Sequence, residues 1–285
     1  MEVDLDASIE QTLQQSHQAL TASKWGEAAL KSAEVIALVS AARRVNNNAQ
    51  LFELHVTDAK LVLGVSETFC RNFEAAADCF LSLHIREDAV LEGWSGEELA
   101  LLAVVAIIGS PKVSRAHLTR TLLDSVQSCL GDFFDNEDPF PTLLRLGKLI
   151  SQCDFGQAIR VLRNLFEATG PRLKLPLSIT NATISNFINV CITESASCYQ
   201  KIPLAVLASD LALSEDDLIE RLSSIIVSSD SKLRSHRIDL EERCLVERTE
   251  TLASHTVLNQ LRESYFHLEL LDFRKLLLDA EIRVE

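Results

Sequence analysis

The chain has 285 residues, 47% of them hydrophobic, and its 41 acidic against 27 basic residues give a formal net charge of −14. It can bury a sizeable core in one or two domains, and its charge argues against nucleic acid as the main partner, because phosphate binding needs a basic surface. The acidic start, Met1 to Asp6, has no apolar stretch, so we expect no secretory signal. The longest apolar run, Leu99 to Ile108, is too short to span a bilayer and predicts a buried helix.

Cysteine, glycine and proline usage narrows the fold class and the compartment. Seven scattered cysteines fit free thiols in a reducing compartment, so we predict cytoplasm and nucleus. Glycine and proline are scarce and helical periodicity dominates, which predicts a mainly α protein with its strands confined to one small wing. Ser95 and Glu98 have the spacing of a capping box at a helix start.

Three short segments share a pattern that is typical of the joint between two packed helices. Each has an aromatic residue where a helix begins and a small residue three positions later. The ring closes the joint and the small residue lets the next helix approach, as in tetratricopeptide-like hairpins. The copies are irregularly spaced, so we predict a degenerate helical-hairpin solenoid; ordinary packing with coincidental aromatics is the alternative. The segments are Lys24–Ala29, Arg71–Ala76 and Cys153–Ala158.

The stretch from Ile202 to Leu222 reads as two helices with a short joint, a helix-turn-helix. Ser214 has the position of an N-cap, and Asp217 three residues later resembles the second half of a capping box. Two short strands are predicted next, 233–240 and 243–246, joined by a polar turn at Glu241 and Glu242. The hairpin makes the unit a winged helix. The apolar face of the two helices is expected to comprise Leu204, Leu207, Ala208, Leu211, Leu218, Leu222 and Ile225.

Charge decides what such a unit can bind. DNA-binding versions place the second helix in the major groove and supply Lys and Arg around it. Here the second helix has four acidic residues and one cation, Arg221. We therefore predict a protein partner. A nucleic-acid adaptor remains the alternative and would use Lys232, Arg234, Arg237 and the Arg43-Arg44 pair.

The tail, residues 250–285, has one long helical pattern with two adjacent apolar stripes. A surface helix needs only one stripe, so two predict a helix enclosed by others, from other chains or from its own repeats. The first stripe contains Leu258, Leu261, Tyr265 and Leu268, and the second contains Phe266, Leu270, Phe273 and Leu277.

Motifs that carry catalytic or metal chemistry are not found. The sequence has no H-x-H, no C-x-x-C and no glycine-rich phosphate loop, and its seven histidines are dispersed. We predict no catalytic, cofactor or metal site and no enzyme. A cysteine enzyme is the alternative, and Cys79 with His84 is the one close pair it could use.

The order of these parts resembles the PCI proteins, the shared scaffold subunits of the proteasome lid, the COP-nine signalosome and the translation initiation factor three complex. Locally the chain is most similar to the branch that contains the first signalosome subunit and its proteasome-lid counterpart. It departs from the family at residues 227–232, where the usual glycine is missing. The segments that carry the resemblance are Ala59–Leu61, Phe73–Leu81, Glu97–Ile108, Arg115–Leu118, Asp154–Ala158 and Ile202–Leu213.

The resemblance implies a division into a helical-repeat region (1–135), a PCI domain (136–249, with the winged helix from about 195) and an assembly helix (250–285). It implies a non-catalytic scaffold of the signalosome, which removes a ubiquitin-like modifier from cullins (deneddylation). Partners would be other PCI subunits and a metalloprotease-containing pair, with no membrane and no nucleic acid; a proteasome-lid subunit is the alternative. Wing strands of neighbouring subunits join edge to edge in this family and tail helices form a bundle. The expected interface comprises Leu233, Arg234, Arg237, Ile238, Leu258, Leu261, Tyr265, Phe266, Leu270, Phe273 and Leu277.

Overall fold

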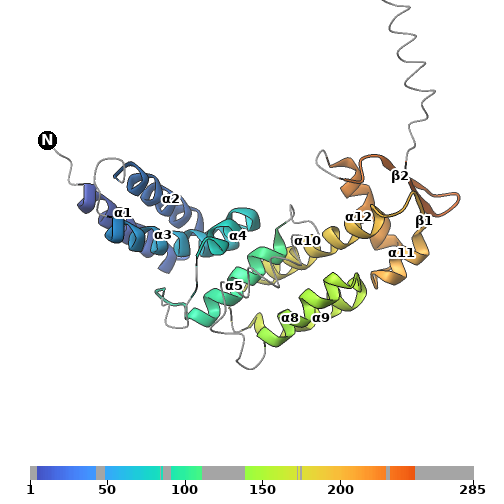
Figure 1. Ribbon diagram of the computed structural model, residues 1–285, viewed down its shortest axis with the longest axis horizontal. Helices are drawn as coiled ribbons and strands as arrows, with labels where there is room; N and C mark the ends of the chain where they lie inside the picture. The colour runs from blue at the N-terminus through green and yellow to red at the C-terminus, as the bar shows by residue number, and fades with distance from the viewer. Residues whose placement is uncertain are drawn as a thin grey trace, which may run out of the picture.

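The helices follow one another as packed neighbours, and a small sheet comes last (Figure 1). The computed structural model describes residues 5–42, 49–83, 85, 91–110, 139–171, 173, 175–228 and 232–247. This part of the chain is mainly helical, as predicted. Its helices are α1 (Leu5–Thr21), α2 (Trp25–Ala42), α3 (Ala49–Phe69), α4 (Phe73–Leu81), α5 (Gly96–Gly109), α8 (Phe140–Ser151), α9 (Phe155–Thr169), α10 (Leu177–Ala196), α11 (Leu204–Asp210) and α12 (Glu215–Val227). Its strands are β1 (Lys201–Pro203), β2 (His236–Asp239) and β3 (Cys244–Glu247).

The three predicted joints connect α1 to α2, α3 to α4 and α8 to α9, and they share one backbone geometry. Each has a non-glycine residue with positive φ: Ser23 at 57°, Arg71 at 63° and Cys153 at 61°. The residue after it donates its N–H to a carbonyl five positions earlier, which is the hydrogen bond of a Schellman turn. The small residues Ala28, Ala76 and Ala158 are fully buried. The joint pattern predicted from the sequence therefore corresponds to one repeated local structure.

Aromatic rings of α4 pack against glycines of its neighbours. A Cβ atom on Gly64 of α3 would lie 2.9 Å from the Phe80 ring, and one on Gly109 of α5 would lie 2.8 Å from the Phe73 ring. Real Cβ atoms are not found at such distances, so only glycine permits this approach. Phe73 is the aromatic residue of the second joint, and its buried ring connects that joint to the end of α5.

Helix α5 joins the two ends of the molecule. It is the predicted buried helix: residues 99–108 are all buried. The capping box is confirmed, because Ser95 Oγ accepts from the Glu98 N–H and Glu98 Oε2 accepts from the Ser95 N–H. Since α5 packs against α3 and α4 and also against α10, one core runs from Ala19 in α1 to Leu245 in β3.

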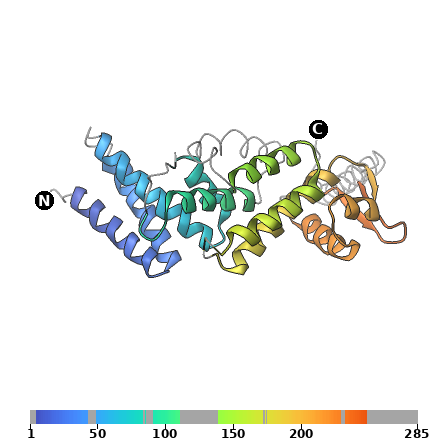
Figure 2. The same ribbon diagram turned by 90° about the horizontal axis from the view of Figure 1, so that it is seen from below.

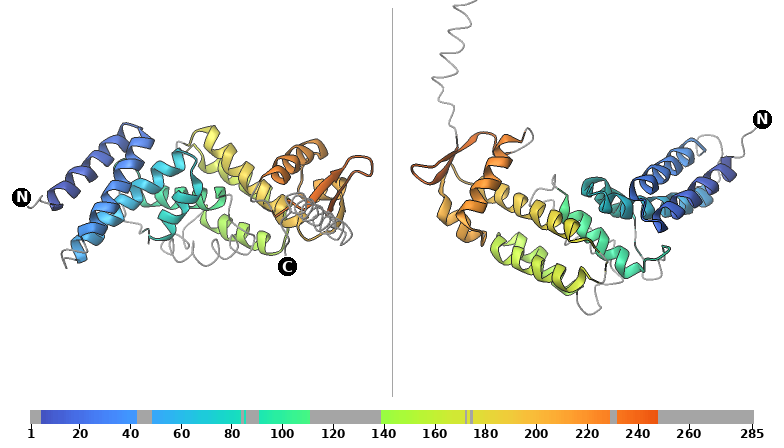
Figure 3. Two further views of the ribbon diagram at one scale, coloured as in Figure 1. Left: turned by 90° about the horizontal axis from the view of Figure 1, so that it is seen from above. Right: turned by 180° about the vertical axis from the view of Figure 1, so that it is seen from behind.

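The described helices form an elongated molecule. Figures 2 and 3 show α1 to α4 at one end, α5 and α8 to α10 in the middle, and α11, α12 and the sheet at the other end. The sheet thus lies at an extremity, where a neighbouring molecule can approach it.

The three strands pair antiparallel in the order β1-β3-β2. Two predictions are wrong here. Ile202 belongs to a strand and not to the first helix, so strand content is not confined to the wing hairpin; pairing with Leu245 buries this residue. Strand β2 begins at His236 and not at Leu233, because Leu233 C=O accepts the His236 N–H (2.8 Å) in a turn.

The predicted joint between α11 and α12 is confirmed. Ala212 has a φ of 53°, and the Leu213 N–H donates to Ala208 C=O, as in the three earlier joints. The expected apolar face is buried except for Ile225, which is half-buried.

Candidate protein interface

Register and burial give the sheet two different faces. Lys201, Val246 and Arg237 form one cross-strand row, in which both cations are exposed. The next row contains Ile202, Leu245 and Ile238, which pack into the core. Side chains in neighbouring rows point to opposite faces of a sheet. The face turned away from the core therefore carries Lys201, Val246 and Arg237, and by the same alternation Asp239 shares it.

Strand β2 is an edge strand: among the described residues it pairs with β3 on one side and with no strand on the other. Alternate residues of an antiparallel edge strand direct N–H and C=O groups outward, where a strand of another polypeptide can pair with them. Asp239 ends the strand, because its Oδ1 accepts the N–H groups of Glu241 and Glu242 (3.1 Å each). This contact fixes the predicted polar turn, and the sequence interpretation missed it.

The four interface residues predicted on the wing do not share one role. Arg234 and Arg237 are exposed. Leu233 is 0% exposed and belongs to the core, and Ile238 packs partly buried against the same core. The two arginine side chains are therefore directed to the solvent, and the two apolar residues hold the hairpin against the helices. The predicted interface residues of the tail, 258–277, lie outside the described residues.

His236 is an unpredicted feature of the same hairpin. It is 4% exposed, and its Nε2 has no hydrogen-bond partner within the described part of the chain. Its Nδ1 lies 3.4 Å from Ser235 Oγ. A hint was available in the sequence, because His236 and Ile238 have the alternation of the inward face of a strand.

Helix α12 carries four acidic residues, of which Asp217 and Glu215 form ion pairs with Arg221 and Arg243. Ser214 caps the helix by accepting the Asp217 N–H (3.2 Å), which confirms the predicted N-cap. The second half of the capping box is not formed; Asp217 Oδ1 instead accepts from Arg221 Nε (3.0 Å). Arg221 Nη1 also donates to Ser185 and Asn189 of α10. The one cation of α12 is thus engaged in holding two helices together.

Other cations of this unit are also paired. Lys232 Nζ lies 2.6 Å from Glu194 Oε1, Arg243 Nη2 lies 2.7 Å from Glu215 Oε2, and Lys201 pairs with Glu242. The hydrogen bond from Lys201 lowers the pKa of Glu242. Within the described residues Arg234 and Arg237 form no ion pair. The Arg43-Arg44 pair lies outside the described residues.

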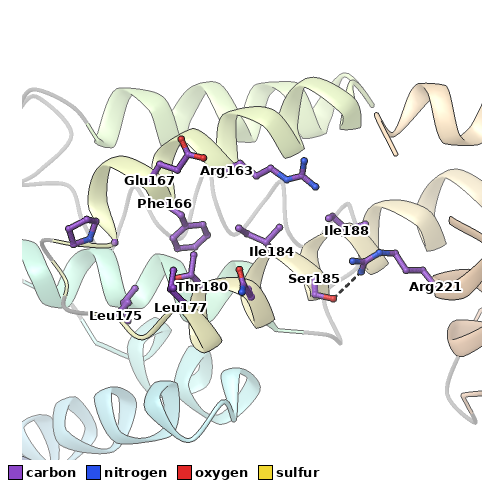
Figure 4. A pocket seen from close by; sticks show the side chains of 13 residues that line it. Arg163, Phe166, Glu167, Leu175, Leu177, Thr180, Ile184, Ser185, Ile188 and Arg221 are labelled. Carbon is purple, nitrogen blue, oxygen red and sulfur yellow. Dashed lines mark hydrogen bonds between the residues drawn. The ribbon is translucent and has the colours of Figure 1, made fainter. Parts of the chain in front are cut away.

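A groove of about 660 Å³ lies between α9 and α10 and reaches α12. Figure 4 shows Phe166 of α9 and Ile184 of α10 directed into it, with Arg163 and Arg221 beside them. Its apolar lining also includes Leu175, Leu177 and Ile188. It arises from helix packing, and no short motif of the sequence predicted it.

Cys79, the thiol of the alternative cysteine-enzyme reading, is in the wrong environment for a nucleophile. Burial, with a smaller contribution from Glu67, raises the pKa of Cys79 to about 11. A reactive cysteine needs a lowered pKa. His84 lies outside the described residues. The six cysteines of the described part are free thiols, as predicted.

In the ranges described above, no three His, Cys, Asp or Glu side chains gather in a way that could hold a metal ion. Among the same residues, none of the helices combines the length and the apolarity needed to cross a membrane. A scan against protein-family models found no matching family, and a search of curated proteins found no match.

Proposed function

We propose that this chain is a non-catalytic scaffold subunit of a PCI-type complex, with the signalosome that removes a ubiquitin-like modifier from cullins as the favoured assembly. The observation that carries the proposal is the open, cation-bearing edge of the sheet at one extremity of the molecule, next to an acidic helix. Such an edge adds a strand from a neighbour through main-chain hydrogen bonds.

The order of elements supports a PCI fold. Helical hairpins with one repeated joint correspond to the tetratricopeptide-like part of such proteins, and α11, α12 and the three strands correspond to a winged helix. In this reading residues 136–249 form the PCI domain and residues 250–285 the assembly helix. The proposed partners are other PCI subunits and a metalloprotease-containing pair.

Charge favours a protein partner over nucleic acid. A major-groove reader presents cations on its second helix. Here α12 begins with Glu215, Asp216 and Asp217, and its cation Arg221 is bonded to Asp217 and to α10. Two exposed arginines on β2 and in the preceding turn cannot supply the broad phosphate contact that nucleic-acid binding requires.

Affinity purification of the tagged full chain from its own cells, followed by mass spectrometry, tests the proposal. We expect signalosome subunits and cullins to co-purify. Proteasome subunits in their place would move the chain to the alternative lid assembly. If the chain co-purifies with RNA and no protein partner, and RNA shifts its mobility in a gel at physiological ionic strength, the scaffold role is contradicted. The alternative role as a nucleic-acid adaptor is then favoured.

A charge-reversal pair tests which surface is used. Arg234→Glu with Arg237→Glu should reduce recovery of the partners at least tenfold, because it replaces two positive charges with two negative charges beside an already acidic helix. The matched control, Arg145→Glu with Arg160→Glu, makes the same change at exposed positions of α8 and α9 and should leave recovery unchanged. An equal loss of partner recovery in both variants would contradict the proposal that partners bind at β2.

A further inference from the structure

The groove between α9 and α10 exposes apolar side chains that an occupant would cover. Leu177, at its α10 wall, is 80% exposed, and Ile184 is half-buried with its side chain directed into the space. Figure 4 shows Leu177, Ile184 and Phe166 among the side chains that line the groove. An apolar groove between helices is a common docking site for one face of an amphipathic helix.

We propose that this groove binds the second apolar stripe of the chain's own tail, Phe266, Leu270, Phe273 and Leu277. The four residues have the i, i+4, i+7, i+11 spacing of one helix face. In a helix the stripe is about 17 Å long. The α10 wall of the groove, from Leu177 to Ile188, covers the same number of positions and is also about 17 Å long.

The tail begins close enough to reach the groove. The described chain ends at Glu247 of β3, in the sheet that packs through β2 on α12, and α12 contributes Arg221 to the groove lining. Residues 248–265 connect this point to the stripe. They can span roughly 60 Å when extended and about 27 Å as a helix. Helix α10 is itself only about 30 Å long, so the connection suffices.

Both signs of charge line the groove: Arg163 and Glu167 of α9 are exposed, and Arg221 is bonded to Asp217. On a helical wheel Glu263 and Glu269 flank the stripe at about 60° on either side, and Arg262 lies about 40° from Phe266 on the side of Glu269.

Docking of the tail within one chain does not depend on the assembly role proposed above. It adds one consequence to that role. The second stripe cannot occupy its own groove and a bundle of partner helices at the same time, so tail release would precede bundle formation.

Photo-cross-linking in the full chain tests the inference. Leu177 is replaced by benzoyl-phenylalanine, and dilute protein is irradiated and mapped by mass spectrometry. We expect adducts on residues 257–280 in the monomer fraction. The same probe in place of Leu30, which is 74% exposed on α2, should give no such adducts. Absence of tail adducts from position 177 would overturn the proposal.

Mixing isotopically heavy and light chains separates one chain from two. Adducts that join only heavy to heavy and light to light segments support docking within a chain, whereas mixed adducts would show a second copy in the groove and overturn the proposal. Phe266→Asp with Phe273→Asp should lower the yield at least tenfold. Leu258→Asp with Leu261→Asp, on the other stripe, should not, and equal effects would refute the assignment of the second stripe.

Discussion

The joints α1–α2 and α8–α9 have the same local structure in different surroundings. Ser23 and Cys153 have nearly equal φ values, 57° and 61°, and their joints have the same hydrogen bonds. A Cβ atom on Gly26 of the first joint would meet nothing within 4 Å, whereas one on Gly156 of the third would lie 2.7 Å from the Asp210 carbonyl oxygen at the end of α11. The local sequence therefore determines the backbone conformation of the joint. The element packed on the joint determines how much a substitution there changes the free energy of unfolding.

Removing the joint aromatic should have the largest effect. Phe155 is buried, so Phe155→Ala should lower the free energy of unfolding by about 3–4 kcal/mol. Trp25 is only half-buried and stacks on Phe69 with 4.2 Å between ring centroids, so Trp25→Ala should cost about 1–2 kcal/mol. Urea unfolding followed by far-ultraviolet circular dichroism measures both. Equal losses would show that the two joints are covered alike.

Replacing Gly26 and Gly156 with alanine should change the free energy of unfolding in opposite directions. Gly156→Ala should lower the free energy of unfolding by about 1–2 kcal/mol, because the new methyl group collides with backbone of α11. Gly26→Ala should raise it by up to about 1 kcal/mol, because alanine is the better helix former and the site is open. A destabilised Gly26→Ala variant would mean that the first joint is also covered.

Replacing the positive-φ residue with glycine should stabilise both joints by the same amount, because the backbone strain at that residue is local. Ser23→Gly and Cys153→Gly should each raise the free energy of unfolding by about 0.5 kcal/mol, the relief of Cβ strain less the entropy of glycine in the unfolded chain. Ala22→Gly, one residue before the strained position, should be destabilising and serves as the control. Unequal gains would count against a shared backbone geometry.

The last comparison is between the buried thiol of Cys79 in α4 and the exposed thiol of Cys153 in the third joint. Burial raises the pKa of Cys79 to about 11 from 9.0, so the unfolded chain loses this proton first and stability should fall as pH rises from 9 to 11. Cys79→Ala should flatten that part of the stability–pH curve. Iodoacetamide at pH 8 should label exposed Cys153 at least tenfold faster than Cys79. Comparable labelling would contradict the burial of Cys79.

Periodicity and end signals were enough to predict the mainly helical class, the buried helix α5, the joints between helices and two N-caps. Ser95, Ser214 and the alanines of the joints act through residues within five positions, which a sequence displays directly. The buried run 99–108 was also readable, because a helix apolar on all sides must be enclosed.

What escaped prediction depends on contacts between distant segments. Ile202 became a strand because Leu245 pairs with it, and Arg221 is engaged by Ser185 and Asn189 of another helix. Leu233 was expected at an interface and lies in the core. Periodicity tells which residues share a face but not which element covers that face, so the groove on α9 and α10 could not be foreseen either.

The central claim is that the open edge of the sheet binds neighbouring polypeptides. The most direct measurement mixes the purified full chain with the PCI subunits of the same organism and with RNA, and resolves the products by size-exclusion chromatography. We expect a stable protein complex that forms in the presence of RNA and is lost when Arg234 and Arg237 are both replaced by glutamate. A chain that stays solitary among these subunits while binding RNA would contradict it.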